Sequence, residues 1–174
     1  YMVGGDLVDM GELRNHWDAF LVNTMDAFSR KPIVPTLGNH DSEGLKGRGR
    51  LIYSRYFTLP GNGPAGMTPG AASSFVHNNV LFIVLDSQND INAQASWLEG
   101  ELRNAASAKA RFKVVMFHVP VYNPKKHRSN PEVQRHWVPL FDKYDVDLVL
   151  NGHDHSYMRS VNLRAGKPPA VGEH

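Results

Sequence analysis

The chain has 174 residues, of which 41% are hydrophobic, so its length and composition fit one domain with a substantial core. Lysine and arginine number 19 against 17 aspartate and glutamate residues, and this near balance disfavours a nucleic-acid partner. The lack of cysteine excludes disulfides, thiolate nucleophiles and cysteine-zinc sites, and no apolar run is long enough to predict a membrane span.

Apolar runs of the strand type alternate with amphipathic helical patterns along the first half of the chain. Apolar residues recur there at three- and four-residue intervals, which is typical of a helix packed on a core. The expected elements are, in order, a strand at residues 1–3, a helix at about 12–29, a short strand at 33–37 and a long loop rich in glycine and proline at 43–72. Loops of that length are usually functional or mobile.

The second half predicts a hairpin followed by two further strand and helix units. Asn78-Asn79 is a hairpin turn signal, and Asn130 followed by Pro131 is a natural helix start, while Pro139 should split that helix in two. The expected strands are residues 73–77, 80–85, 112–117 and 146–150. These patterns indicate an α/β protein with a mixed sheet or two sheets, in which ligands collect at the carboxyl ends of strands.

Polar side chains with ligand chemistry follow several of these predicted strands. The residues at strand ends are Asp6, Asn39 with His40, His118, and the pair His153 and His155 in the run Asn151-Gly152-His153-Asp154-His155. In an extended backbone, residues i and i+2 project to the same side, so the two histidines of the last loop can face one site. Their shared position at strand ends predicts one functional centre.

Each of these residues also has a purely structural interpretation. Asp6 and the Gly38-Asn39-His40-Asp41 segment can be polar turns. His118 can be a core histidine whose ring is satisfied by backbone groups, and two loop histidines are more often solvated than bound to metal. The recurrence at several strand ends is what favours a ligand set over turn chemistry.

A set of one aspartate, one asparagine and three histidines offers oxygen and nitrogen ligands without sulfur. Such a set suits zinc, manganese, iron or cobalt better than calcium. A carboxylate such as Asp6 can bridge two ions, and two bridged ions can hold a hydroxide that attacks phosphorus. His40 follows Asn39 directly, so we expect its ring to point away from that ion and to contact substrate or protonate the leaving oxygen.

Four motifs carry a family resemblance, in this order: Gly5-Asp6, Gly38-Asn39-His40-Asp41, His118, and Gly152-His153-Asp154-His155. This series resembles the calcineurin-like metallophosphoesterases over about residues 3–160. The intervening segments 56–63, 84–87, 117–122 and 146–153 are similar to the purple-acid-phosphatase-like branch. The resemblance implies a four-layer αββα sandwich, with two mixed β-sheets packed face to face and helices outside.

The resemblance also implies a role for each matched position. Asp6 would bridge two metal ions, while Asn39, His118 and His153 would complete one site and His155 would serve the other. The implied cofactors are two divalent transition-metal ions, with iron, manganese and zinc as the candidates.

Two further histidines would face the substrate by the same resemblance. His40 is the expected catalytic histidine, and His127 lies in a loop where purple acid phosphatases place a further substrate histidine. For His127, a solvated loop residue is the alternative interpretation.

The sequence departs from the family pattern at two places. No aspartate has a histidine two residues later, so the Asp-x-His motif that opens the family is missing. We therefore expect residues 1–174 to be a single metallophosphoesterase domain that lacks the first strand and is incomplete at both termini. Asp9 stands where purple acid phosphatases have a tyrosine that binds ferric iron, so divalent ions are favoured.

The resulting functional expectation is a metal-dependent phosphoric ester hydrolase, with a phosphomonoesterase first, acting on small-molecule phosphate esters. A phosphodiesterase on the same core and a truncated, non-catalytic metal-binding module are the alternatives. Nuclease action is disfavoured by the weak basic character. The resemblance alone favours an extracellular or periplasmic location.

Overall fold

The computed structural model describes residues 1–104, 109–123 and 130–168. Its helices are α1 (Arg14–Phe28), α2 (Asn39–Ser42), η1 (Leu45–Gly47), α3 (Arg48–Tyr56), α4 (Ile91–Arg103), α6 (Pro131–His136) and α7 (Val138–Lys143). Its strands are β1 (Met2–Val3), β2 (Val34–Pro35), β3 (Ser73–His77), β4 (Val80–Val84), β5 (Phe112–Met116) and β6 (Leu148–Leu150). None of the described helices is both long enough and apolar enough to cross a membrane.

The strands form two sheets, as the sequence predicts. Strands β1 and β2 pair in parallel, and β3, β4, β5 and β6 form a four-stranded sheet in that spatial order. The β3–β4 pair is antiparallel, whereas β4–β5 and β5–β6 are parallel. The larger sheet is therefore mixed, but the smaller one is purely parallel among the described residues, in contrast to the expected two mixed sheets.

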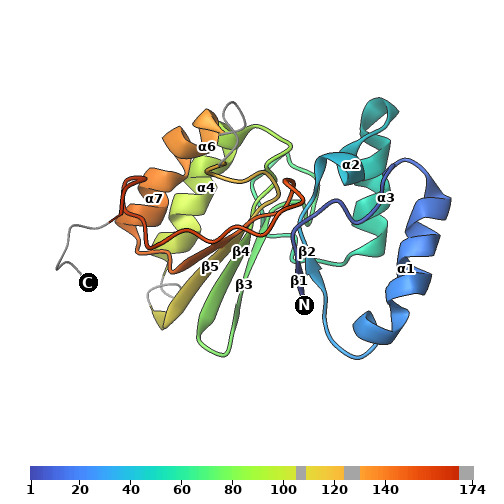
Figure 1. Cartoon of the computed structure of the whole chain (residues 1–174), viewed down its shortest axis with the longest axis horizontal. Helices are drawn as coiled ribbons and strands as arrows, with labels where there is room; N and C mark the ends of the chain where they lie inside the picture. The colour runs from blue at the N-terminus through green and yellow to red at the C-terminus, as the bar shows by residue number, and fades with distance from the viewer. Residues whose placement is uncertain (105–108, 124–129, 169–174) are drawn as a thin grey trace.

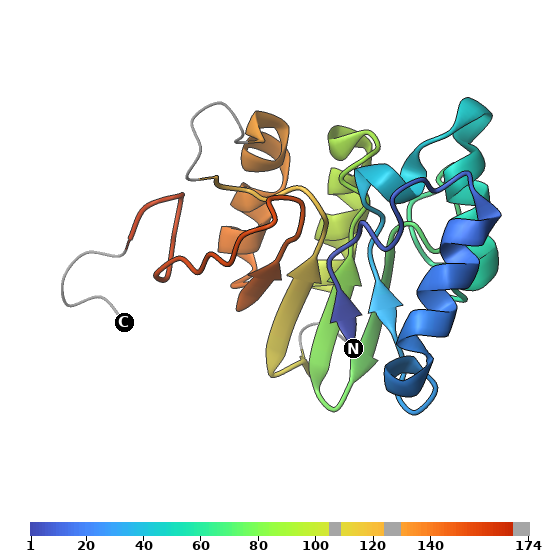
Figure 2. The same ribbon diagram turned by 45° about the vertical axis from the view of Figure 1, so that its right-hand side comes forward.

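Helices cover the two sheets on opposite outer sides. Figure 1 shows α4, α6 and α7 beyond the four-stranded sheet, and α1 and α3 beyond the β1–β2 pair. We call the first group with β3–β6 the larger half, and α1, α2 and α3 with β1 and β2 the smaller half. The carboxyl ends of β1, β2, β4 and β5 point toward the same edge (Figure 2). The halves are joined there by a hydrogen bond of 3.0 Å, in which Thr36 Oγ1 donates to the carbonyl of Leu85.

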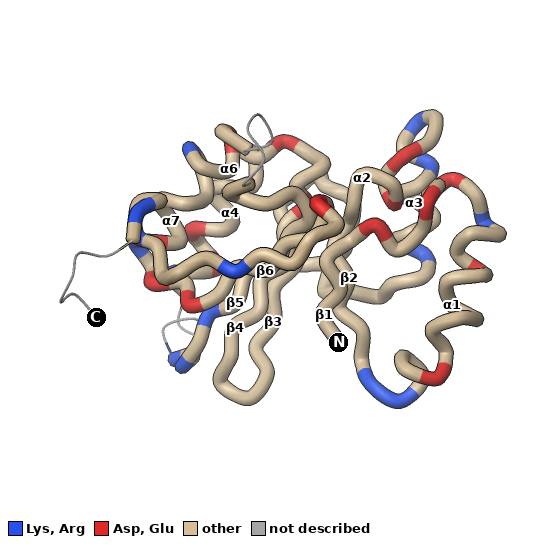
Figure 3. Tube along the Cα trace, in the orientation of Figure 1, with Lys and Arg blue, Asp and Glu red and all other residues tan. Residues whose placement is uncertain are grey.

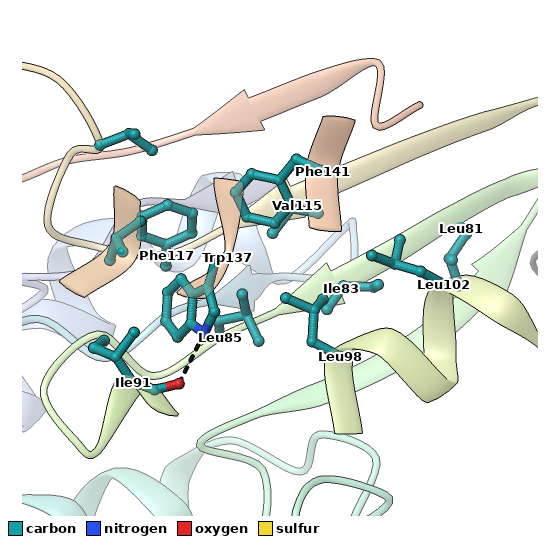
Figure 4. Packing of buried hydrophobic residues seen from close by; sticks show 12 residues of the cluster. Leu81, Ile83, Leu85, Ile91, Leu98, Leu102, Val115, Phe117, Trp137 and Phe141 are labelled. Atoms are coloured by element: carbon teal, nitrogen blue, oxygen red, sulfur yellow. Dashed lines mark hydrogen bonds between the residues drawn. The ribbon is translucent and has the colours of Figure 1, made fainter. Parts of the chain in front are cut away.

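The larger half has the more extensive core. Figure 4 shows Trp137 packed among buried side chains of β4, β5 and α4, with its indole nitrogen donating to the Ile91 carbonyl over 2.9 Å. The ring of Phe117 meets Trp137 edge-on at 5.0 Å between centroids. Satisfying the indole N–H while its rings are fully buried lets this residue anchor α6 and α7 on the sheet.

The smaller half is built around aromatic rings from α1 and α3. Trp17 is fully buried, stacks on Tyr56 at 5.6 Å, and donates its indole N–H to the Gly11 carbonyl over 2.8 Å. The outer face of α1 leaves Val22 and Met25 exposed by 70% and 60%. This half therefore buries less of its apolar surface than the larger half.

Most expected elements are present with shorter strands. Asn78 and Asn79 both adopt positive φ (47° and 63°), as a two-residue hairpin turn requires, and the helix opened by Asn130 breaks at Trp137. The long loop expected at residues 43–72 is wrong in its first part, because that part contains η1 and α3. Gly47 and Gly49 interrupt the sequence pattern, yet Gly49 is buried at the start of α3.

The charged residues do not gather on one face. Figure 3 shows lysine and arginine at several separated places along the described chain, interspersed with acidic residues. This distribution offers no continuous basic track of the kind that a phosphate backbone requires.

Candidate metal centre

Four of the expected ligand residues come together where the two halves meet. His118 Nε2 lies 3.0 Å from Asp6 Oδ2 and 3.1 Å from Asn39 Oδ1. His153 Nδ1 lies 3.0 Å from Asn39 Oδ1 and 3.2 Å from His118 Nε2. Among the described residues, Asp6, His118 and His153 form a group able to hold a metal ion. Asp6 and Asn39 come from the smaller half, and the two histidines come from the larger half.

The chemistry of this donor set fits a transition-metal ion. His118 Nδ1 lies 2.6 Å from the carbonyl of Gly4, which can only accept, so this nitrogen carries the proton. In the neutral ring, the lone pair of Nε2 then faces the oxygens of Asp6 and Asn39, which are also acceptors. A tetrahedral ion with bonds of about 2.0–2.1 Å separates its ligand atoms by about 3.3–3.4 Å. The observed separations of 3.0–3.2 Å are close to this value.

The Gly4 carbonyl acts on His118 as an outer partner acts on a metal-binding histidine. Such a partner fixes the tautomer and the orientation of the ring. His118 is fully buried, so its ring cannot turn outward into solvent. The end of β1 in the smaller half therefore orients a ligand that is carried by the larger half.

Two glycines permit the close approach of these loops. A Cβ atom on Gly5, which has φ of +87°, would lie 2.6 Å from His118 Nδ1. A Cβ atom on Gly38 would lie 2.1 Å from Asp6 Oδ1. Both contacts are shorter than real Cβ contacts, so glycine is required at these positions for the ligands to meet.

The expectation for the last loop is only partly met. His153 joins the cluster, but His155 is exposed and lies outside the metal-capable group. The assumed extended backbone is wrong, because His153 and His155 both adopt positive φ (71° and 47°), so the i, i+2 argument does not apply. Asp6 also adopts positive φ (53°), and such strained conformations in non-glycine residues concentrate at functional sites.

His40 lies beside the cluster with its ring directed elsewhere. Its backbone N–H donates to Asp6 Oδ1 over 3.1 Å, while its Nδ1 lies 2.8 Å from the carbonyl of Asp9. The hydrogen bond to that carbonyl raises the pKa of His40, with the nearby carboxylates of Asp6, Glu43 and Asp9 adding to the effect and burial opposing it. The other expected substrate histidine, His127, lies outside the described residues.

Sequence reasoning missed the part played by Asp41. This side chain is fully buried, and its oxygens accept hydrogen bonds from the backbone N–H groups of Leu7, Val8 and Gly38 at 2.8, 3.2 and 2.8 Å. Burial raises the pKa of Asp41, and the three hydrogen bonds oppose that shift. The sequence signal was its place at the end of the Gly38-Asn39-His40-Asp41 motif, to which no role for Asp41 was assigned.

A second buried carboxylate, Asp86, is used differently. It follows β4, is fully buried, pairs with Arg50 and accepts a hydrogen bond of 2.9 Å from the backbone N–H of Gln88. Gln94 adds two further hydrogen bonds to the backbone of Asp86. Its partners lie in α3, in α4 and in the loop after β4, so Asp86 stabilises the packing of these segments.

The sequence model of the calcineurin-like phosphoesterase family matches residues 1–157. The chain belongs to this family. An uncharacterised protein of Mycobacterium tuberculosis is 32% identical over 185 residues, which cover 94% of this chain and 35% of that protein. Purple acid phosphatase 18 of Arabidopsis thaliana is 26% identical over 187 residues, covering 99% of this chain and 41% of the relative. The chain thus spans well under half the length of these relatives.

A solved structure shares the fold. The purple acid phosphatase PPD1 from yellow lupin seeds matches 89% of this chain and 30% of its own, with a TM-score of 0.69 and 18% sequence identity. This likeness confirms the expected α/β architecture with two sheets and outer helices. This structure and the Arabidopsis relative are both purple acid phosphatases, the branch that the sequence resembles.

Proposed function

We propose that this chain carries the centre of a metal-dependent phosphoric ester hydrolase, and that its preferred substrates are phosphomonoesters of small molecules. The observation that carries this proposal is the convergence of Asp6, Asn39 and His153 on His118, whose Nε2 lies 3.0–3.2 Å from a ligand atom of each. Membership of the family supports hydrolysis of phosphate esters. The branch of the family supports the monoester preference.

In this proposal, the chain holds two divalent transition-metal ions drawn from iron, manganese and zinc. Asn39, His118 and His153 would hold one ion, Asp6 would serve both, and His155 would contribute to the second site. When bound, such a pair of ions activates water and neutralises charge on the phosphoryl oxygens. The mixed oxygen and nitrogen donor set without sulfur supports this choice of metals.

His40 is proposed to protonate the leaving oxygen of the substrate. Its bond to the Asp9 carbonyl leaves Nε2 of the partly exposed ring available to a bound ester. His127 is proposed as a second substrate contact, and an extracellular or periplasmic location is proposed from the family branch.

Hydrolysis of a mono-aryl and a bis-aryl phosphate by the metal-loaded protein tests the proposal. We expect faster turnover of the monoester, and a decrease of about 100-fold or more in kcat for His40→Ala, within the usual contribution of a general acid. His77→Ala, on the exposed hairpin, is the matched control and should keep full activity. Preference for the diester would overturn the choice of substrate.

Metal analysis distinguishes an enzyme from a non-catalytic metal-binding module. The second site has fewer identified ligands than the first, because the sequence lacks the Asp-x-His motif and His155 is exposed. Two ions per chain together with phosphatase activity are expected for the enzyme. Less than one ion per chain with no turnover would contradict the two-metal proposal.

A further inference from the structure

We propose that Asp41 is a positioning residue that sets the separation of Asp6 and Asn39, and thereby tunes the affinity of the centre for metal. This inference rests on the proposed function, because it assigns those two side chains as ligands. It adds a residue that contacts no member of the donor set through its own side chain, and that acts only through the backbone of both loops.

The hydrogen bonds of Asp41 reach the backbone directly beside two ligands. Leu7 and Val8 follow Asp6, and their N–H groups point at Oδ1 of Asp41 over 2.8 and 3.2 Å. Gly38 precedes Asn39, and its N–H donates to Oδ2 over 2.8 Å. One fully buried carboxylate therefore joins the loop after β1 to the loop after β2.

This connection is needed because the strands themselves are short. Strands β1 and β2 pair through two residue pairs, Met2 with Val34 and Val3 with Pro35. The pairing ends before Asp6, which has an unfavourable φ of 53°. Such a conformation persists only where surrounding contacts over-determine it. The bonds to Leu7 and Val8 supply these contacts just after the strained residue.

The position requires acceptors on both oxygens of the side chain. Three N–H donors face Asp41, and a carboxylate satisfies all of them. Asparagine has nearly the same shape, but its NH₂ group would oppose one set of donors. The Asp41→Asn variant therefore releases one of the two loops while it preserves the volume of the buried side chain.

Asp86 offers a matched control for the effect of burial. It is also a fully buried carboxylate after a strand, and its partners are Arg50, Gln88 and Gln94. Asp86→Asn weakens a buried ion pair and lowers the stability of the fold. Among the described residues, none of its hydrogen bonds reaches a backbone N–H beside Asp6 or Asn39.

The experiment is a titration of the metal-free chain with Co²⁺, whose visible absorption reports the geometry of its ligands. We expect Asp41→Asn to weaken Co²⁺ binding by about 10–100-fold, the usual effect of losing an outer partner of a metal ligand, and to change the visible spectrum. Asp86→Asn should keep the affinity of the unaltered chain within about twofold and give the same spectrum. Denaturant unfolding of each metal-free variant measures stability separately.

A second variant covers the case in which Asp41→Asn does not fold. Asp41→Ser is smaller, buries no amide donor opposite the backbone N–H groups, and should weaken Co²⁺ binding in the same direction. If either folded variant binds Co²⁺ with unchanged affinity and spectrum, the positioning role is overturned while the proposed function stands. If the unaltered chain binds no Co²⁺, the proposed function fails and this inference fails with it.

Discussion

The two halves of the molecule contribute to the candidate centre in different ways. The larger half supplies His118 and His153 from just beyond the ends of the neighbouring parallel strands β5 and β6, which pack on the larger hydrophobic core. The smaller half supplies Asp6 from the loop after β1 and Asn39 from the first residue of α2, and its core has fewer buried residues. The imidazoles are therefore held by the sheet, whereas the oxygen ligands depend on side-chain hydrogen bonds and close glycine contacts.

This difference suggests that the centre joins a robust half to a weaker one. The Gly4 carbonyl, the Thr36 hydroxyl and the Arg50 guanidinium reach across the boundary to His118, Leu85 and Asp86. A bound ion would add four contacts at the same place. Metal binding and the stability of the smaller half should consequently be coupled.

The largest effect is expected when the same truncation is made in each of the two cores. Trp137→Ala and Trp17→Ala each remove a fully buried indole, which costs about 3–5 kcal/mol of unfolding free energy. We expect Trp137→Ala to destabilise the whole chain, and Trp17→Ala to lower protection from hydrogen exchange mainly in the smaller half. Denaturant unfolding with hydrogen exchange measures both. Identical exchange profiles in the two variants would remove the distinction between the halves.

The next largest effect is expected when a metal ligand is removed from the larger half. His118→Ala deletes a buried imidazole that faces both oxygen ligands, so metal affinity should decrease by more than about 100-fold, beyond the usual effect of an outer partner. Calorimetric titration with Zn²⁺ or Mn²⁺ measures this loss. His77→Ala, exposed on the hairpin, serves as the control, and an equal loss in both variants would contradict the assigned site.

Metal addition should stabilise the smaller half. At a metal concentration of about 100 times Kd, opening of the centre becomes harder by about 2.7 kcal/mol. Amide exchange at Leu7 and Val8 should slow accordingly, whereas exchange at Asn78 and Asn79, on the distant hairpin turn, should stay unchanged. Equal slowing at the hairpin, or none at Leu7, would show that the ion does not hold the junction.

The smallest effect concerns a helix cap within the larger half. Asp90 caps α4 by accepting a hydrogen bond of 3.0 Å from the N–H of Ala93, so Asp90→Ala should cost about 1 kcal/mol of stability. Asn92→Ala, exposed on the same helix, is the control. Metal affinity should be unchanged in both variants, since α4 carries no ligand, and a decrease would argue that the larger half is less rigid than its core indicates.

Much of this architecture was accessible from the sequence because hydrophobic patterning sets it. Apolar runs that end in Asp6, Asn39 and His118 predicted strand ends, and parallel strands bring such ends to one edge. The break in the helix near Pro139 and the Asn78-Asn79 turn follow from local backbone chemistry in the same way.

The remaining features depend on contacts between distant segments. Gly49 is buried against the backbone of Glu43 and Asp41, so α3 forms despite a composition that predicts a loop. His153 and His155 both adopt positive φ, which the expected extended backbone does not allow for. Asp41 acquires its importance from Leu7 and Val8, more than thirty residues away, and no local signal reports such a partner.

The span of the contacts at the centre has a consequence for the order of events during protein synthesis. His118 meets Gly4, and His153 meets Asn39, each across 114 residues of chain. Ribosomes add about 5–20 residues per second, so the oxygen ligands emerge several seconds before the last imidazole. We expect metal loading to follow the emergence of the last imidazole, as a closing step rather than a nucleus for folding.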